Sequence, residues 1–487
     1  MRLQDVVPAE VALPKEAREL EIRGITASSS NAGPGVIFAA LPGIKTDGAL
    51  YIPDAIARGA TAILVGADKS IADTGISVVL RVANPRRALA LIASRLHPGQ
   101  PGTSVAVTGT SGKTSVADFT RQIFTTLGHR AASLGTIGLI KPDEAIYGSL
   151  TTPDPVTLHA TLDALAQEGI THLAFEASSH GLDQHRLDGV KLTAAAFTNL
   201  GRDHMDYHPT VEDYLAAKLR LFTELLESGQ TAVVNSDGAF ADRVVAAAEA
   251  RGLRIITTGA KGDTLRRVSL KNEGFAQALE VEAFGKSYSI RLPLVGAYQA
   301  ENALTAAGLA IAAGENPDAV LAVLERLRGV PGRLEIVGEA KGGLAIVDYA
   351  HKPEALTAAL DACRPFVTGK LICVFGCGGD RDKGKRAIMG QISVEKADVT
   401  IVTDDNPRTE TPADIRAEIL TGAKGAMEIG DRAEAIATAV KMMGEGDVVL
   451  VAGKGHETGQ IIGTKVIPFS DHQALSAALD EVRPDGG

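Results

Sequence analysis

The stretch Gly109-Thr110-Ser111-Gly112-Lys113-Thr114 decides the fold of the middle of this chain. An apolar run at residues 104–107 precedes it and an amphipathic stretch at residues 116–124 follows it, which predicts a strand, a glycine-rich loop and a helix. Glycines let backbone N–H groups close around phosphate oxygens, and the N-terminus of a helix adds partial positive charge. The loop therefore predicts a nucleotide site in which Lys113 reaches the terminal phosphates and the Thr114 hydroxyl ligates Mg²⁺.

Length and composition indicate a multidomain protein with small-molecule partners. The chain has 487 residues, 45% hydrophobic and 22% charged, so we expect several buried cores. A formal net charge of −10 without a basic run argues against a nucleic-acid surface. Because we find neither a signal-peptide core nor an apolar stretch that could span a bilayer, we expect a cytoplasmic protein with no membrane partner. We also expect a monomer. The odd number of cysteines, Cys363, Cys373 and Cys377, indicates reduced thiols.

Proline- and glycine-rich linkers at residues 97–102 and 329–333 divide the chain into predicted domains 1–101, 102–332 and 333–487. In the second and third domains short apolar runs alternate with helix-length amphipathic segments, as in parallel sheets covered by helices. We therefore expect an α/β fold. It has a central, mostly parallel phosphate-loop sheet with helices on both faces, a Rossmann-like C-terminal domain and a smaller N-terminal α/β domain.

Polar clusters follow the predicted strands at the point where each strand ends. They lie at residues 176–180, 198–204 and 235–237 of the second domain, and at 376–385, 403–408 and 452–457 of the third. Ligands of open α/β sheets bind beyond the carboxyl ends of strands. Both domains are therefore expected to present a functional edge.

An ordered series of motifs resembles the Mur ligase family of ATP-dependent amide ligases. The series runs through Leu41-Pro42-Gly43, the phosphate loop, Thr151-Thr152-Pro153, Glu176-Ala177-Ser178-Ser179-His180, Asp203-His204-Met205-Asp206-Tyr207-His208, Gly332-Arg333-Leu334-Glu335, Asp348-Tyr349-Ala350-His351, Asp405-Asn406-Pro407-Arg408 and Gly453-Lys454-Gly455-His456-Glu457. It covers almost the whole chain. The family also uses the short form of the phosphate loop that is present here.

The resemblance implies a reaction of peptidoglycan precursor synthesis. ATP would convert the D-glutamyl carboxylate of UDP-N-acetylmuramoyl-L-Ala-D-Glu into an acyl phosphate, and an amine of meso-2,6-diaminopimelate would then displace phosphate. Carboxylates do not react with amines at neutral pH, so activation of this kind is required. The implied cofactors are ATP and Mg²⁺, and the implied partners are these small molecules.

The resemblance also implies which residues bind the nucleotide and the metal ion. The nucleotide set consists of Gly109, Thr110, Ser111, Gly112, Lys113, Thr114 and Ser115, together with Asn302, Arg333 and Asp348. Thr114, Glu176 and His204 are the implied metal ligands, and Lys113, Glu176, His204 and Lys218 the implied catalytic group. If the phosphate loop were absent, the simpler interpretation would be that Glu176 is a solvated carboxylate at the end of a strand and that His204 is an ordinary loop histidine.

Lys218 looks like an ordinary helix lysine from its periodicity alone. The resemblance instead implies that CO₂ carbamylates it to N6-carboxylysine. A cation beside Mg²⁺ is repelled, whereas the carbamate is an anion that can ligate or orient the metal ion.

The implied UDP-substrate residues come from the first two domains. They are Ser29, Ile44, Lys45, Thr46, Thr151, Thr152, Ser178, Gln184 and Arg186. Arg186 suits an anionic group because its guanidinium binds phosphate or carboxylate in bidentate fashion. The chain departs from the family at residues 28–30, where relatives usually show Asp-Ser-Arg, and at Gln299, where many have asparagine.

The implied diaminopimelate residues come from the third domain. They are Arg381, Asp405, Asn406, Pro407, Arg408, Gly453 and Glu457. Diaminopimelate carries a distal ammonium and a distal carboxylate, whereas lysine carries only the ammonium. An arginine left unpaired by lysine would discriminate by about 3 kcal/mol. In isolation, residues 405–408 also fit an ordinary type I turn.

Three other functions stay open from the sequence. The nearest alternative is the same ligation with L-lysine or another amino acid. Replacing Arg408 would distinguish the two functions by the amine that the enzyme uses. A kinase or NTPase with this phosphate loop would not need both a nucleotide-sugar peptide and an amine. A non-enzymatic nucleotide sensor would not need the metal ligands and basic loops.

Overall fold

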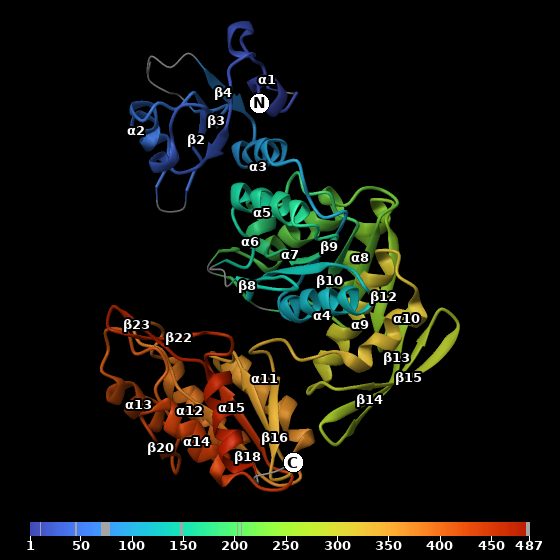
Figure 1. Cartoon of the computed structure of the whole chain (residues 1–487), viewed down its shortest axis with the longest axis vertical. Helices are drawn as coiled ribbons and strands as arrows, with labels where there is room; N and C mark the ends of the chain where they lie inside the picture. Colours follow the sequence, from blue (N-terminus) through green and yellow to red (C-terminus); the bar gives the residue numbers. More distant parts are fainter. Residues whose placement is uncertain are drawn as a thin grey trace. The chain divides into compact units, whose positions relative to one another are not determined.

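The computed structural model describes residues 1–9, 11–43, 46–69, 78–146, 150–201, 203–205 and 207–483. The chain divides into two compact units, Met1–Thr258 with Thr305–Asn316, and Gly259–Leu304 with Pro317–Gly487. Figure 1 colours the first unit mainly blue to green and the second mainly yellow to red. Within the described ranges, no helix has the length and apolar character needed to cross a bilayer.

The N-terminal part of the first unit is a small parallel sheet with the strand order β1-β2-β3-β4. Its elements are β1 (Gly24–Thr26), β2 (Val36–Ala39), β3 (Ala62–Gly66), β4 (Val79–Val82), α1 (Leu3–Val6), α2 (Ile52–Ala57), α3 (Pro85–Leu96) and the short helices η1 (Lys15–Ala17), η2 (Ser29–Asn31) and η3 (Gly48–Tyr51). The Asn84 side chain caps α3 by accepting from the Arg87 N–H at 3.0 Å. Leu89 and Ile92 of α3 pack in one core with Leu64 of β3.

The rest of the first unit is built on eight neighbouring sheet strands in the order β12-β11-β10-β5-β9-β6-β7-β8. All of its pairs are parallel up to β6, and the two at the β8 edge are antiparallel. The strands are β5 (Thr103–Thr108), β6 (Ala131–Gly135), β7 (Gly138–Ile140), β8 (Ala145–Ile146), β9 (His172–Glu176), β10 (Ala194–Phe197), β11 (Thr231–Asn235) and β12 (Arg254–Gly259). The prediction of a mostly parallel central sheet is confirmed.

Helices cover this central sheet, as Figure 1 shows. They are α4 (Lys113–Thr126), α5 (Pro155–Gln167), α6 (Ser179–Asp183), α7 (Val211–Arg220) with the π-helical turn η4 (Leu221–Leu225), and α8 (Ala241–Ala250). Leu158 of α5 and Tyr214 of α7 share a core with Phe175 of β9 and Phe197 of β10. Because β5 ends at Thr108 and α4 begins at Lys113, the glycine-rich loop joins strand to helix as predicted.

The second unit contains a three-stranded antiparallel segment that sequence reasoning missed. It consists of β13 (Leu265–Glu273), β14 (Ala276–Ala283) and β15 (Lys286–Leu292). β14 alternates buried and exposed residues along its second half, as expected for a sheet with one solvated face. The helices α9 (Ala297–Ala312) and α10 (Pro317–Val323), with η5 (Leu324–Arg326), follow it along the chain.

The remainder of the second unit is a sheet with the order β16-β17-β21-β18-β19-β20, in which only the β16–β17 pair is antiparallel. Its elements are β16 (Glu335–Ala340), β17 (Gly343–Asp348), β18 (Leu371–Phe375), β19 (Val399–Val402), β20 (Met427–Glu428), β21 (Val448–Ala452), the hairpin β22 (Gly459–Ile462) and β23 (Lys465–Pro468), and the helices α11 (Pro353–Cys363), η6 (Arg364–Phe366), α12 (Lys385–Lys396), α13 (Pro412–Leu420), α14 (Arg432–Met442) and α15 (Asp471–Val482). This arrangement is the Rossmann-like α/β fold expected of the C-terminal region.

Alternation along β17 explains why this sheet carries helices on both faces. Leu344 and Ile346 pack in one core with residues of α11, α12 and α13. Ala345 and Val347 point the other way and pack with residues of α14 and α15. The three cysteines are free and buried in this unit, and burial raises the thiol pKa of both Cys373 and Cys377 to about 12. The thiols of Cys373 and Cys377 are therefore protonated near neutral pH.

Candidate functional site

The phosphate loop of the first unit is a tight turn that two glycines make possible. Gly109 and Gly112 have φ angles of +146° and +86°, which side-chain-bearing residues rarely adopt. A Cβ atom on Gly109 would lie 1.9 Å from Thr198 Oγ1, so the close approach of the chain after β10 excludes any larger residue. Lys113 Nζ donates to the carbonyls of Gly109 and Thr110 at 3.0 and 2.9 Å. The predicted amine therefore lies directly on the loop.

Glu176 is placed beside this loop by the pairing of strands. It is the last residue of β9 and lies opposite Val107 of β5 in the parallel register. The carboxylate is 2% exposed and accepts hydrogen bonds from the Thr136 backbone N–H at 2.7 Å and hydroxyl at 3.2 Å. Thr114 lies in the first turn of α4 and is 8% exposed. A hydroxyl and a carboxylate are hard oxygen donors, so these two residues fit Mg²⁺ in chemical type.

Lys218 is buried against the same loop, which its helical periodicity did not reveal. Its side chain is 1% exposed, and Nζ donates to the Gly109 carbonyl at 2.8 Å. The amine also lies 4.3 Å from the centre of the Tyr214 ring, whose hydroxyl is 3.2 Å from Thr110 Oγ1. Burial, reinforced by the nearby charge of Lys113, holds the pKa of the Lys218 amine well below its ordinary value. The fold thus favours the neutral amine, the form that reacts with CO₂.

His204 belongs to an aromatic group that borders Tyr214. Its ring lies edge-on to His180 at 4.8 Å and to Tyr214 at 6.2 Å, measured between ring centres. The side chain is 44% exposed, and Nε2 lies 3.7 Å from a carboxylate oxygen of Asp203. A positive φ of 55° at His204 marks a sharp turn of the chain. The structure therefore brings His204 into the neighbourhood of Lys218 through their shared contact with Tyr214.

The predicted UDP-substrate residues of the second predicted domain form one hydrogen-bonded network. The Thr152 hydroxyl donates to the Glu176 carbonyl at 2.9 Å and accepts from the Ser178 N–H at 3.0 Å. The Arg186 guanidinium donates to the Thr152 carbonyl at 2.6 Å and to Gln184 Oε1 at 2.8 Å. The Ser178 hydroxyl caps α6, and the Thr151 hydroxyl lies 3.1 Å from that of Thr136. This network links the substrate set to the carboxylate beside the phosphate loop.

A cavity of about 470 Å³ in the first unit adjoins this network. Gln184 and Arg186 line it from one side, and Thr26 and Ser28 line it from the N-terminal sheet. Ser29 is outside the lining and hydrogen-bonds Asp54, which lowers the pKa of that carboxyl. Thr46 is not among the described lining residues, and its carbonyl accepts from the Gly43 N–H at 3.1 Å. The predicted residues Ile44 and Lys45 lie outside the described residues.

The remaining predicted nucleotide residues, Asn302, Arg333 and Asp348, lie together in the second unit. The Asn302 amide donates to Gln299 Oε1 at 3.0 Å, and the Gln299 amide donates to the Arg333 carbonyl at 3.1 Å. Gln299 therefore bridges Asn302 and Arg333. Asp348 is bound by the Leu334 and Ala350 N–H groups at 2.7 and 2.8 Å, and burial raises its carboxyl pKa.

A cavity of about 740 Å³ lies at the carboxyl ends of β17, β18, β19 and β21 in the second unit. Six of the seven predicted diaminopimelate residues line it, namely Arg381, Asp405, Asn406, Arg408, Gly453 and Glu457. Pro407 is the one that does not. Neighbouring parallel strands end at one edge, so residues distant in sequence converge there. Tyr349, His351 and Lys385, which the prediction omitted, also line the cavity.

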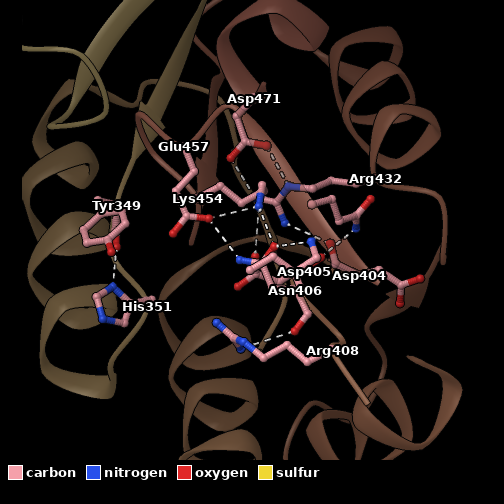
Figure 2. Close-up of polar contacts among 12 residues, drawn as sticks. Tyr349, His351, Asp404, Asp405, Asn406, Arg408, Arg432, Lys454, Glu457 and Asp471 are labelled. Atoms are coloured by element: carbon pink, nitrogen blue, oxygen red, sulfur yellow. Dashed lines mark hydrogen bonds and ion pairs between the residues drawn. The ribbon is translucent and has the colours of Figure 1, made fainter. Parts of the chain in front are cut away.

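Buried ion pairs and hydrogen bonds hold the polar wall of this cavity, as Figure 2 shows. The Asn406 amide donates to Glu457 Oε2 at 3.0 Å, and Lys454 Nζ donates to Asn406 Oδ1 at 3.1 Å and to Glu457 Oε2 at 3.1 Å. Asp405 is 7% exposed, and its Oδ1 has no hydrogen-bond partner in the described part of the chain, although Lys454 Nζ lies 3.5 Å away. Arg408 donates to the Gly379 carbonyl at 2.8 Å.

Beneath the wall lies a pair that sequence reasoning missed. Arg432 of α14 and Asp471 of α15 are both fully buried, with Nε–Oδ1 and Nη2–Oδ2 distances of 2.6 and 2.8 Å. The same guanidinium donates to the carbonyls of Asp404 and Ala452, which follow β19 and end β21 (Figure 2). Asp471 raises the pKa of Arg432 against the opposing effect of burial. No local pattern indicates that these two residues meet.

The fold agrees with comparisons to known proteins. Residues 21–97, 107–310 and 332–455 match, respectively, the catalytic domain of the Mur ligase family, the Mur ligase middle domain and the Mur ligase glutamate ligase domain. The chain belongs to the Mur ligase family.

Relatives with closely similar sequences carry one name. The UDP-N-acetylmuramoyl-L-alanyl-D-glutamate–2,6-diaminopimelate ligase of Bradyrhizobium diazoefficiens is 56% identical over 98% of this chain and 99% of its own length. The ligase of that name from Brucella melitensis is 54% identical over 98% of both chains. A solved structure of such a ligase matches with a TM-score of 0.75 at 32% identity, covering 99% of each chain.

Proposed function

We propose that this chain is the ATP-dependent ligase that joins 2,6-diaminopimelate to UDP-N-acetylmuramoyl-L-alanyl-D-glutamate. The observation that carries the proposal is the cavity in the second unit, where the Arg408 guanidinium and the Asp405 carboxylate line one wall. A substrate whose far end bears both a carboxylate and an ammonium satisfies both groups. The relatives that share more than half of their residues with this chain support the same reaction.

The residues of the phosphate loop suit the first half of the reaction. Gly109–Ser115 and the Lys113 amine would bind and neutralise the phosphates of ATP. Arg333 and Asn302 are further candidates for nucleotide binding. Arg333 supports this role because its buried Nε has no hydrogen-bond partner in the described ranges. Thr114, Glu176 and His204 would hold Mg²⁺, which neutralises phosphate charge when bound. The glutamyl carboxylate then attacks the terminal phosphorus, and ADP leaves.

The residues of the two cavities suit the second half of the reaction, the attack of the amine on the acyl phosphate. Gln184 and Arg186 would hold the UDP-linked peptide, with Thr151, Thr152 and Ser178 behind them. Asp405, Asn406 and Glu457 would orient the incoming amino acid, with Arg381 and Gly453 completing the wall. The amine attacks the acyl carbon, the tetrahedral intermediate expels phosphate, and an amide bond remains. We also propose the domain bounds 1–101, 102–332 and 333–487, which the three family matches support.

We expect phosphate release only when ATP, the UDP-linked dipeptide and diaminopimelate are all present. With ¹⁸O in the D-glutamyl carboxylate, one labelled oxygen should appear in the released phosphate, because the acyl phosphate transfers that oxygen. Mass spectrometry of the phosphate measures this transfer. Rapid phosphate release without the amine, or unlabelled phosphate in full turnover, would instead support a simple NTPase.

We expect Arg408→Ala to lower kcat/KM for meso-diaminopimelate by about 100-fold, because the distal carboxylate loses a charged partner. The kcat/KM for L-lysine, which has no such carboxylate, should change by less than about threefold. Mass spectrometry of products formed from each amine measures the ratio. Arg364→Ala is the matched control, since Arg364 pairs with Asp398 on the surface, outside the cavity. Equal losses for both amines would contradict a distal-carboxylate role.

A further inference from the structure

Two histidines and a glutamate meet at the end of the central sheet opposite the phosphate loop. His129 lies between α4 and β6, His172 is the first residue of β9, and Glu315 follows α9. β6 and β9 run parallel, so both begin at this edge, whereas the phosphate loop and Glu176 follow carboxyl ends. The length of β9 separates His172 from Glu176 by about 13 Å, at about 3.3 Å per residue. The cluster is therefore distinct from the nucleotide site.

The three side chains direct donor atoms to a common point. Within the described ranges they form the only group of three or more potential ligands whose donor atoms all lie within 4.8 Å of one another. His129 Nε2 is 2.8 Å and His172 Nε2 is 4.0 Å from the same oxygen of Glu315, Oε1. In a tetrahedral site with metal–ligand bonds of about 2.0–2.1 Å, donors stand about 3.3 Å apart. Small side-chain rotations would bring the three donor atoms from their present distances to this tetrahedral spacing.

The surroundings of the imidazoles favour metal coordination over a simple ion pair. The rings of His129 and His172 stack at 3.8 Å, an arrangement that two protonated imidazoles would oppose. His172 Nδ1 hydrogen-bonds the Thr171 hydroxyl at 2.9 Å, which orients Nε2 toward Glu315.

We propose that His129, His172 and Glu315 bind a divalent first-row transition metal ion, for which Zn²⁺ is the best fit. Two imidazoles and a carboxylate are a preferred set for Zn²⁺, and a fourth position remains for water. Mg²⁺ prefers oxygen donors and is not expected here. The bound ion would tie the start of β9 to the segments after α4 and α9. Because Asn316 is the last residue of the first unit, the ion would also anchor the chain where it leaves that unit.

The test uses the full chain, stripped of metals by a chelator and kept in excess Mg²⁺ to occupy oxygen-rich sites. Calorimetric titration with Zn²⁺ should show one ion per chain, and Co²⁺ should give the visible absorption of a low-coordinate nitrogen and oxygen site. His172→Ala and Glu315→Gln should each weaken Zn²⁺ binding by at least tenfold. His472→Ala is the matched control, because His472 pairs with Glu335 at 2.8 Å without a second histidine. That variant should bind Zn²⁺ like the wild type.

Thermal unfolding separates loss of the site from loss of the fold. Zn²⁺ should raise the Tm of the wild-type chain and of His472→Ala but not that of Glu315→Gln, which conserves the volume of the side chain. Should His172→Ala fail to fold, Glu315→Gln alone decides. The proposal is overturned if the wild type binds no Zn²⁺, or if both variants bind it as tightly as the wild type, since the ion would then lie elsewhere.

Discussion

Replacing Lys218 with methionine is expected to lower kcat by about 10³-fold, comparable to the loss of a preorganised electrostatic contact in a water-excluded site. Methionine keeps most of the volume of the buried lysine but can carry neither a charge nor a carbamate. The effect should be far larger than that of Lys191→Met, because Lys191 is exposed and precedes β10, whereas the phosphate loop contacts Thr198 after the other end of that strand. Initial rates at saturating ATP, dipeptide and diaminopimelate measure the loss.

The Lys218→Arg variant separates the two roles that this residue could have. Arginine keeps a positive charge and a donor for the Gly109 carbonyl, which Lys218 contacts at 2.8 Å, but CO₂ cannot carbamylate it. If a carbamate is required, we expect Lys218→Arg to be as inactive as Lys218→Met. Retention of activity by the arginine variant would show that the cation itself is what the loop needs.

Dependence on CO₂ is the direct readout of the modification. The pKa of Lys218 is lowered, so near neutral pH the neutral amine is more abundant than in an exposed lysine, and acidification should reduce carbamylation. Wild-type activity should fall in CO₂-free buffer and return when bicarbonate is added. A ¹³C signal from labelled bicarbonate should be present in the wild type and absent from Lys218→Arg. Wild-type activity independent of CO₂, without such a signal, would contradict the carbamate.

Replacing Arg432 with methionine is expected to lower the free energy of unfolding of the second unit by about 3–5 kcal/mol. The variant leaves the Asp471 carboxylate fully buried without its partner, and it removes the donors to the Asp404 and Ala452 carbonyls. The desolvation of an unpaired charge is the dominant cost. Urea denaturation followed by circular dichroism measures the change.

Two further variants test this explanation. Arg432→Met combined with Asp471→Leu removes both charges and should recover most of the lost stability, because no unpaired charge remains. Lys286→Met breaks an exposed pair with Asp318, where the two side chains are 60% and 53% exposed, and should cost less than about 1 kcal/mol. If Arg432→Met is no more destabilising than Lys286→Met, the buried pair does not hold this unit together.

Loss of Arg432 should also affect the cavity that we propose binds diaminopimelate. The guanidinium holds the carbonyls of Asp404 and Ala452, each adjacent to a wall residue, Asp405 or Gly453. Their displacement would loosen the contacts that orient the incoming amine. The rise in KM for diaminopimelate should therefore persist at temperatures where the variant is still folded.

The sequence by itself determined those features whose residues are contiguous. Gly109–Thr114 indicates a phosphate-binding loop between a strand and a helix, because all of its functional residues lie within one short stretch of chain. The sequence also indicated that residues 405–408 lie at the edge of a sheet, since they form a polar run directly after an apolar strand. The ordered motifs between them were enough to indicate the family and the chemistry.

Only the tertiary structure decided how distant residues meet. Periodicity could not show that Lys218 is buried on the Gly109 carbonyl, that Arg432 pairs with Asp471, or that His129, His172 and Glu315 converge. It also missed the antiparallel strands between residues 265 and 292. Hydrophobic patterning reports which face of an element is buried. The burial, charge state and partner of a polar side chain depend on which elements the packed sheets bring together.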